Sequence, residues 1–362
     1  MLYITPRASN SLLKLVKTLE KHQLPICVYF PANICYTFPL SCLYSNSTIK
    51  LYDISYETLY PDYSSVRLED SDSRSIKIFV CVIPYGNWDL NQIKDNRQKI
   101  RHLLGKETFI VWDCALTFPT YNTLNYICQI QNEYESFVFS FSYAKPIELG
   151  FGSAIFTKLN LHYNHPLKIN RFQISYLVNK VDKRYKTYLN LFKLAQKRYS
   201  FLCYNSELDE SDSKQIYSMI EKIASNQDFA LTLRKQIKIT YFELLDKIIS
   251  NNRFFKANLE GLGIDFVDKC DISWRFNIRV HESIRDSLIK RIFQNGGYVS
   301  RLFPSISHLF NNNFLYPNSS RHWQRIVNIF NNQDKTYNDI VFQTIRQTIQ
   351  EIQNKGVSQS IK

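Results

Sequence analysis

The sequence predicts an α/β protein that has a large domain with a mainly parallel sheet and a small C-terminal α+β domain. In the first half, short apolar segments of strand length alternate with amphipathic segments, which is the pattern of βαβ units. Long helical patterns follow, and the last part combines two strand-like segments with helices. We expect a large domain over 1–175, a helical linking region over 176–255 and a small domain over 256–362.

The elements of the large domain are predicted from their hydrophobic spacing. A first helix is expected over 11–21 (SLLKLVKTLEK), where apolar residues form one face and Ser9-Asn10-Ser11 offer N-cap chemistry. Further helices are expected over 90–104 and 121–133. The strand candidates are short apolar runs at 26–30, 49–52, 76–83, 108–112, 136–140 and 153–157.

The second half begins with the linking region, where helical patterns cover 174–195 and 211–249. Residues 274–280 (WRFNIRV) alternate as a strand does, a helix is expected over 283–294, and a second strand follows at 298–302. A last helix over 337–353 is expected to pack on this small domain.

Composition narrows the classes of protein. The chain has no run near the roughly 20 apolar residues that span a bilayer, and its start lacks the features of a secretory signal. The eight cysteines are scattered without zinc-ligand spacing, so we expect buried, reduced thiols, no metal and a cytoplasmic location.

The charge balance favours a small anionic substrate over a nucleic acid. Lys and Arg number 45 against 32 Asp and Glu, which gives a net charge of +13. The basic residues are spread along the chain, and no recognition helix or zinc finger is evident. We therefore expect no nucleic-acid partner and no membrane, although the positive field would attract a small anion.

The most informative segment is 137–157 (FVFSFSYAKPIELGFGSAIFT), where an apolar strand ends near Ser140 and Lys145 follows. A lysine amine at such a strand end can form a Schiff base with an aldehyde cofactor, and the Ser140 hydroxyl can bind a phosphate oxygen. The alternative for Lys145 is a surface lysine in a loop.

Upstream, the apolar strand in 108–115 (TFIVWDCA) ends in Asp113. An ionised carboxylate there can keep the ring nitrogen of pyridoxal 5'-phosphate (PLP) protonated, which makes the ring an electron sink. The start of the first helix would supply phosphate donors. The alternatives are a turn cap at Asp113 and plain helix caps at Ser9 and Ser11.

Taken in order, these residues resemble the DegT/DnrJ/EryC1/StrS family of PLP-dependent aminotransferases. Four motifs carry the resemblance besides the small-domain segment WRFNIRV: Ser9-Asn10-Ser11 for the family's Ser-Gly-Thr helix start, Pro84-Tyr85-Gly86 for its aromatic-Gly turn, Asp113-Cys114-Ala115 for Asp-x-Ala, and Ser140-Phe141 with Lys145 for Ser-Phe-x-x-x-Lys.

The resemblance implies a fold-type I PLP enzyme, an atypical member that forms a homodimer and serves sugar biosynthesis. It implies transfer of an amino group from a donor to a keto-sugar nucleotide or related small keto substrate. Lys145 would be catalytic and bind PLP as a Schiff base. The cofactor-binding residues would be Asp113, Ser140, Ser9, Asn10, Ser11 and Tyr85.

Two other functions stay open, because Leu116 stands where the family usually has His or Gln and Asn10 replaces a glycine. The first is a PLP enzyme of another reaction type. The second is a degenerate, non-catalytic member that acts as a binding or partner subunit.

Several other residues have a functional and a structural interpretation. Tyr85 or Trp88 could stack on the cofactor ring, but an aromatic residue near a turn usually serves packing. Arg275 and Arg279 share one face of a strand and could bind a carboxylate or phosphate, although we expect that face to be solvated. His308 and His322 are expected to be structural. Asn170-Arg171 is a candidate for the phosphate site of a neighbouring subunit.

Overall fold

The computed structural model describes residues 1–42, 45–69, 74–161, 208, 210–232, 238–267, 270–307, 316–331 and 333–354. The helical pattern over 174–195 and the candidates Asn170-Arg171 and His308 lie outside these residues. In the part of the chain that is described, no helix combines the length and the apolar character needed to cross a membrane.

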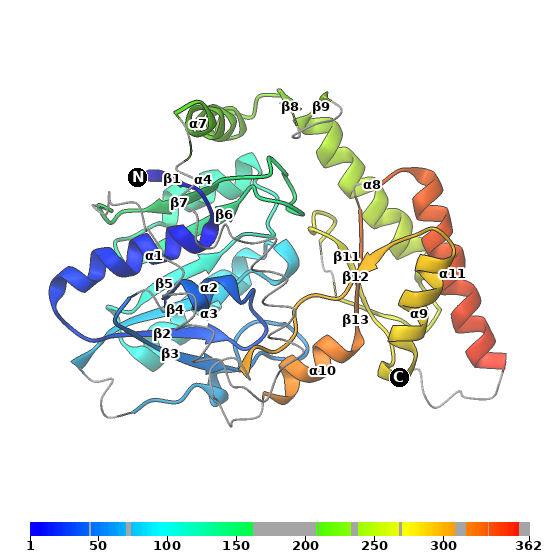
Figure 1. Cartoon of the computed structure of the whole chain (residues 1–362), viewed down its shortest axis with the longest axis horizontal. Helices are drawn as coiled ribbons and strands as arrows, with labels where there is room; N and C mark the ends of the chain where they lie inside the picture. The colour runs from blue at the N-terminus through cyan, green and yellow to red at the C-terminus, as the bar shows by residue number, and fades with distance from the viewer. Residues whose placement is uncertain are drawn as a thin grey trace, which may run out of the picture.

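The large domain is built on a seven-stranded sheet of order β1-β7-β6-β5-β4-β2-β3 (Figure 1). Strands β2 to β6 are parallel, whereas β7 is antiparallel to β6 and pairs antiparallel with β1. The bounds are β1 Leu2–Thr5, β2 Ile26–Pro31, β3 Ser47–Tyr52, β4 Ile76–Val82, β5 Phe109–Asp113, β6 Glu135–Ser140 and β7 Ser153–Thr157. The mainly parallel sheet is confirmed, and β1 is an edge strand that the sequence patterns did not reveal.

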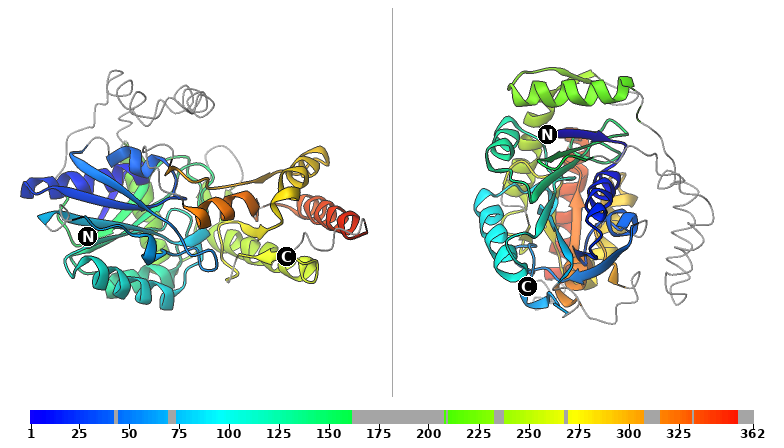
Figure 2. Two further views of the ribbon diagram at one scale, coloured as in Figure 1. Left: turned by 90° about the horizontal axis from the view of Figure 1, so that it is seen from below. Right: turned by 90° about the vertical axis from the view of Figure 1, so that its left-hand side faces the viewer.

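Helices cover both faces of this sheet, so the domain has three layers (Figure 2). On one face, α1 and α2 pack on inward side chains such as Val28, Val80 and Val111. On the other face, α3, α4 and α7 pack on Phe79, Trp112 and other aromatic side chains. The bounds are α1 Ala8–Leu19, α2 Thr37–Cys42, α3 Leu90–Leu104, α4 Tyr121–Ile130 and α7 Glu210–Ala224. Strands buried on both faces explain the nearly continuous apolar runs in the sequence.

The small domain is an antiparallel sheet of order β10-β11-β13-β12, covered by helices. Its elements are β10 Asp265–Phe266, β11 Phe276–Arg279, α9 Glu282–Gln294, β12 Val299–Ser300, α10 Pro317–Arg325, β13 Ile326–Ile329 and α11 Lys335–Asn354. The α+β character is confirmed. Strand β13, in the centre of the sheet, was missed because its four residues, IVNI, offer too short a pattern.

Helix α8 (Tyr241–Leu259) connects the two cores. It follows a two-stranded hairpin of β8 (Ala230–Thr232) and β9 (Lys238–Thr240), and it begins with a capping box between Thr240 and Glu243. Leu244 and Ile248 pack in the core of the large domain, whereas Phe255 and Leu259 pack in that of the small domain.

A buried carboxylate joins the two domains. Asp53 lies just after β3 and is only 2% exposed. Its Oδ2 accepts from the Asn318 amide at 2.9 Å, and its Oδ1 accepts from the Ser319 amide at 2.8 Å. Tyr316, the N-cap residue of α10, makes no side-chain cap. Asp53 therefore caps α10 from the other domain, where it satisfies the same N–H groups as a local cap would.

Candidate active site

Asp113 is the last residue of β5, and its side chain is nearly buried at the carboxyl edge of the sheet. Its Oδ1 accepts a hydrogen bond of 3.0 Å from the Ala115 amide. Burial raises the pKa of Asp113, while this hydrogen bond and the charge of Lys145 oppose the rise. The carboxyl edge is the usual place for ligands in an open α/β sheet.

Lys145 lies in the loop between β6 and β7 and is partly buried. Burial lowers the pKa of Lys145, and the positive charge of Arg275 lowers it further. Cys35 and Asp113 act in the opposite direction and raise this pKa. Among the described residues, its amine makes no hydrogen bond or ion pair. A lysine with a lowered pKa has more of the neutral amine, which is the nucleophilic form.

The backbone before Lys145 is held from both sides. Ala144 has a left-handed conformation, with φ of 57°. Its N–H donates to Glu148 Oε2 at 3.0 Å, and its carbonyl accepts from Trp274 Nε1 at 2.7 Å. A non-glycine residue rarely adopts this conformation without such support. Trp274 precedes β11, so the small domain fixes the position of the lysine.

The predicted phosphate ligands occupy two places. Ser140 is the last residue of β6, and its hydroxyl lies 2.9 Å from that of Ser142. Ser9, Asn10 and Ser11 lie within the first turn of α1, which begins at Ala8 with Arg7 as its N-cap. The expectation that the helix begins at residue 11, with these three residues as caps, is therefore wrong.

The Ser11 side chain points toward the sheet. Its hydroxyl lies 2.7 Å from Thr5 Oγ1 and 3.1 Å from Ser153 Oγ, and it is fully buried. Ser153 also donates to the Phe139 carbonyl. Ser11 thus joins α1 to β1 and β7, and the donors that this helix end offers to an anion are its backbone N–H groups.

Tyr85 lies in the short helical turn η4 (Pro84–Gly86) and faces the small domain. Its hydroxyl donates to the Leu302 carbonyl at 2.5 Å and lies 2.9 Å from His322 Nε2. The side chain packs with Leu116 and Trp274. The hydroxyl of Tyr85 is therefore used between the domains, and only its ring is left for the predicted stacking. Trp88 packs on Tyr126 and Phe137.

Gly86 lets this turn approach the chain that follows Asp113. It has φ of 80°, and a Cβ at this position would lie 2.0 Å from the Leu116 carbonyl oxygen. Any side chain would push apart the backbone of the two loops. Leu116 itself is buried in the cluster between the domains, so the side chain at this position is apolar.

His322 is a fully buried member of a hydrogen-bond chain between the domains. Arg279 Nε donates to its Nδ1 at 3.2 Å, so the neutral ring carries its proton on Nε2 and donates to the Tyr85 hydroxyl. Burial and the charge of Arg279 lower the pKa of His322 to about 3. The expectation of a structural role for this histidine agrees with these contacts.

We predict that His322 makes stability depend on pH. Its pKa is about 3 in the folded chain, against 6.5 for an unperturbed histidine, so below pH 6.5 only the unfolded chain binds the proton. Above pH 6.5 His322 does not reduce the free energy of unfolding. Below it, protonation of the unfolded chain at this residue lowers that free energy by about 1.4 kcal/mol per pH unit, until the pH approaches 3. Urea unfolding should show a loss from this group of about 2 kcal/mol between pH 7 and pH 5.

The matched variants isolate this effect. His322→Gln should reduce the loss by that amount, whereas replacement of the exposed His22 by Gln should leave it unchanged. An equal pH dependence in His322→Gln and the wild type would show that His322 is not the group responsible.

Arg275 and Arg279 do not lie on a solvated face. They are 4% and 5% exposed, respectively, so the expected solvent-facing interpretation is wrong. The face that they share packs toward the large domain, where the Arg279 guanidinium donates to the Tyr56 carbonyl. Within the small domain, the same guanidinium pairs with Asp265 of β10. A strand pattern shows which residues share a face but not what covers that face.

Sequence reasoning also missed Cys35, Glu148 and Trp274. Cys35 lies beyond β2 and is close enough to affect the pKa of Lys145. The parallel order of the strands offers a signal for it, because loops after β2, β5 and β6 all leave the same edge. The thiols were expected to be buried, and that is wrong for Cys128, which is exposed, and for the half-buried Cys35 and Cys270.

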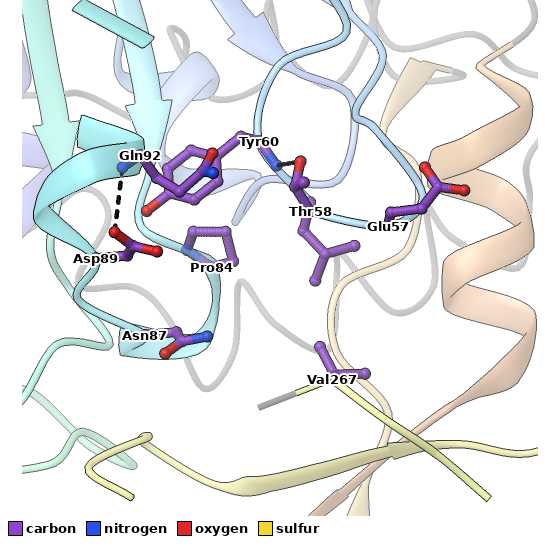
Figure 3. Close-up of a pocket in the computed structure, with 9 residues that line it drawn as sticks. Glu57, Thr58, Tyr60, Pro84, Asn87, Asp89, Gln92 and Val267 are labelled. Atoms are coloured by element: carbon purple, nitrogen blue, oxygen red, sulfur yellow. Dashed lines mark hydrogen bonds between the residues drawn. The ribbon is translucent and has the colours of Figure 1, made fainter. Parts of the chain in front are cut away.

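A pocket lies beside the η4 turn, where Pro84 is one of its lining residues (Figure 3). It holds about 390 Å³ of empty space including its mouth, and Tyr60, Asp89 and Gln92 are among its lining residues, with Val267 from the small domain. The Tyr60 hydroxyl is buried and has no partner among the described residues. We expect a bound water to satisfy it.

Comparison with solved structures identifies the fold. The sugar aminotransferase CalS13 from Micromonospora echinospora superimposes with a TM-score of 0.62 at 15% identity over 96% of this chain and 87% of the other. NtdA from Bacillus subtilis with bound cofactor PMP superimposes with a TM-score of 0.61 at 13% identity, over 96% of this chain and 73% of the other. A DegT DnrJ EryC1 StrS aminotransferase from Brucella abortus superimposes with a TM-score of 0.61 at 12% identity, over 96% of this chain and 85% of the other.

Comparison of the sequence with protein-family profiles and with curated protein sequences gave no match. At 12–15% identity, the similarity to these solved structures is a similarity of fold. The predicted fold-type I architecture is confirmed.

Proposed function

Because the chain has the fold of these aminotransferases, we propose that it is a PLP-dependent aminotransferase that acts on a keto-sugar nucleotide or related small keto substrate. One observation carries the proposal. The amine of Lys145, which has a lowered pKa and no partner among the described residues, lies close enough to the buried Asp113 for each charge to shift the pKa of the other. The expected homodimer belongs to the same proposal.

The residues at this edge fit PLP chemically. Lys145 supplies the amine that would hold the aldehyde as a Schiff base, and Asp113 supplies a carboxylate for the pyridine nitrogen. Ser140 and the backbone N–H groups at the start of α1 would bind the phosphate. Bound PLP acts as an electron sink for a carbanion at the substrate carbon.

In this proposal, Lys145 moves the proton at the reacting carbon, since its neutral amine can accept a proton and its ammonium form can return it. The Asp113 carboxylate would keep the ring nitrogen of a bound cofactor protonated. Trp274 and Glu148 fix the backbone before the lysine, which limits the positions that its amine can reach.

A PLP enzyme of another reaction type is the second candidate. The observation that favours it is the buried, apolar Leu116, which offers no polar contact to a cofactor ring.

The test is reconstitution of the wild type with PLP, followed by addition of glutamate. We expect a visible absorption band from the cofactor on the lysine, and we expect glutamate to bleach it as the amino group is transferred. A band that glutamate and other amino donors leave unchanged would favour the second candidate. A folded protein that develops no band would exclude both enzyme functions.

A further inference from the structure

The guanidinium of Arg275 is held in place by aromatic rings. Its Cζ lies 4.2 Å from the ring centroid of Trp274 and 3.2 Å from that of Phe330. The whole residue is 4% exposed. Contact with the faces of aromatic rings positions a guanidinium but does not satisfy its N–H groups, which lie in the plane of the guanidinium.

The Nε of Arg275 is buried and makes no hydrogen bond among the described residues, and no described carboxylate pairs with this guanidinium. Arg279, four residues further on, is equally buried but is satisfied by Asp265, His322 and the Tyr56 carbonyl. A buried arginine N–H without an acceptor is costly, and an anionic ligand would supply the acceptor.

Arg275 faces the same site as Lys145. The preceding residue, Trp274, donates from its indole to the carbonyl of Ala144, the residue before Lys145. The positive charge of Arg275 lowers the pKa of Lys145, and the charge of Glu148 acts on Arg275. The Glu148 carboxylate is already bound to the Ala144 amide through Oε2.

We propose that Arg275 binds an anionic group of the substrate, a carboxylate or a phosphate, beside Lys145. The identity of this ligand as substrate rests on the proposed function, whereas the binding of an anion does not. A carboxylate or phosphate presents two oxygens to a planar guanidinium, and such paired charge-assisted hydrogen bonds are strong. The rings of Trp274 and Phe330 hold the guanidinium ready, so little side-chain entropy is lost on binding.

The experiment is calorimetric titration of the full chain, with and without PLP, at constant ionic strength. Two probes are used: glutarate, a dicarboxylate that has no amino group to transfer, and inorganic phosphate. Comparison of their affinities distinguishes a carboxylate from a phosphate as the preferred group. We expect the wild type to bind at least one probe, and we expect Arg275→Gln to bind it on the order of 10- to 100-fold more weakly.

Arg253→Gln is the matched control, because that arginine is exposed and pairs with Asp271. It should bind like the wild type. Arg275→Lys keeps the charge and loses the planar fork, so it should show an intermediate affinity. It also provides the comparison if Arg275→Gln does not fold.

Two results would overturn the proposal: a wild type that binds neither probe, or Arg275 variants that bind as the wild type does. Either result would leave Arg275 as a structural clamp between two rings. Failure of the proposed function has a different signature, because anion binding that depends on Arg275 would persist in a protein that never develops the PLP band.

Discussion

Replacing Lys145 with alanine is expected to abolish covalent attachment of PLP while leaving the protein folded. In the proposed function the amine of Lys145 is the group that would react with the aldehyde, and alanine offers none. Stability should not fall through loss of the charge. Burial lowers the pKa of Lys145, so at neutral pH ionised lysine is less favourable in the folded than in the unfolded chain, and this cost disappears in the variant.

The measurement is borohydride reduction of the PLP-loaded protein, followed by peptide mass mapping. Reduction converts the Schiff base to a stable amine, so the labelled lysine can be identified. Lys158→Ala is the matched control, because Lys158 is exposed and follows β7. We expect label at Lys145 in the wild type and in Lys158→Ala, and none in Lys145→Ala. Undiminished label in Lys145→Ala would mean that another lysine holds the cofactor.

If Lys145→Ala loses the cofactor but keeps its stability, the role of Lys145 is functional and not structural. Thermal unfolding of the apo proteins should give a midpoint for Lys145→Ala equal to or above that of the wild type. A functional group in an environment that disfavours its charged form behaves in this way, because its removal also removes that cost. A structural lysine would show the opposite result, a loss of stability on truncation.

The sheet and the positions of Asp113 and Ser140 at its carboxyl edge could be predicted because their signals are local. Asp113 and Ser140 each end a run of apolar residues, and the parallel order of such strands brings their ends to one edge. That geometry needs no knowledge of side-chain contacts. The placement of Lys145 follows in the same way, since it lies five residues after Ser140 in the loop that leaves this edge.

The remaining features depend on contacts between distant segments. The polar sequence of Ser9-Asn10-Ser11 suggests a helix cap, but the fully buried Ser11 hydroxyl is used by Thr5 and Ser153. The strand pattern around Arg275 suggests a solvated face, but its neighbour Trp274 contacts the carbonyl before Lys145. Ser153 lies 142 residues from Ser11 in the sequence, and Trp274 lies 130 residues from Ala144. Hydrophobic spacing gives no signal of a contact between such distant segments.

Replacing Asp53 with alanine is expected to lower the free energy of unfolding by about 3 kcal/mol, because buried amides lose a charged acceptor. The carboxylate accepts from the amides of Ile54, Asn318 and Ser319 and from the Ser319 hydroxyl. Water cannot easily replace it, since Asp53 and Ser319 are buried. Urea unfolding at pH 7 measures the change.

Asp89→Ala is the matched control, because Asp89 caps α3 by accepting from two amides, those of Asn91 and Gln92, but is only half-buried. Its loss should cost about 1 kcal/mol, the usual value for a local cap that water can partly replace. Equal losses in the two variants would mean that Asp53 is an ordinary cap. A larger loss for Asp53→Ala would show that one carboxylate holds α10 on the large domain, and with α10 the strand β13 that pairs with β11 beside the site.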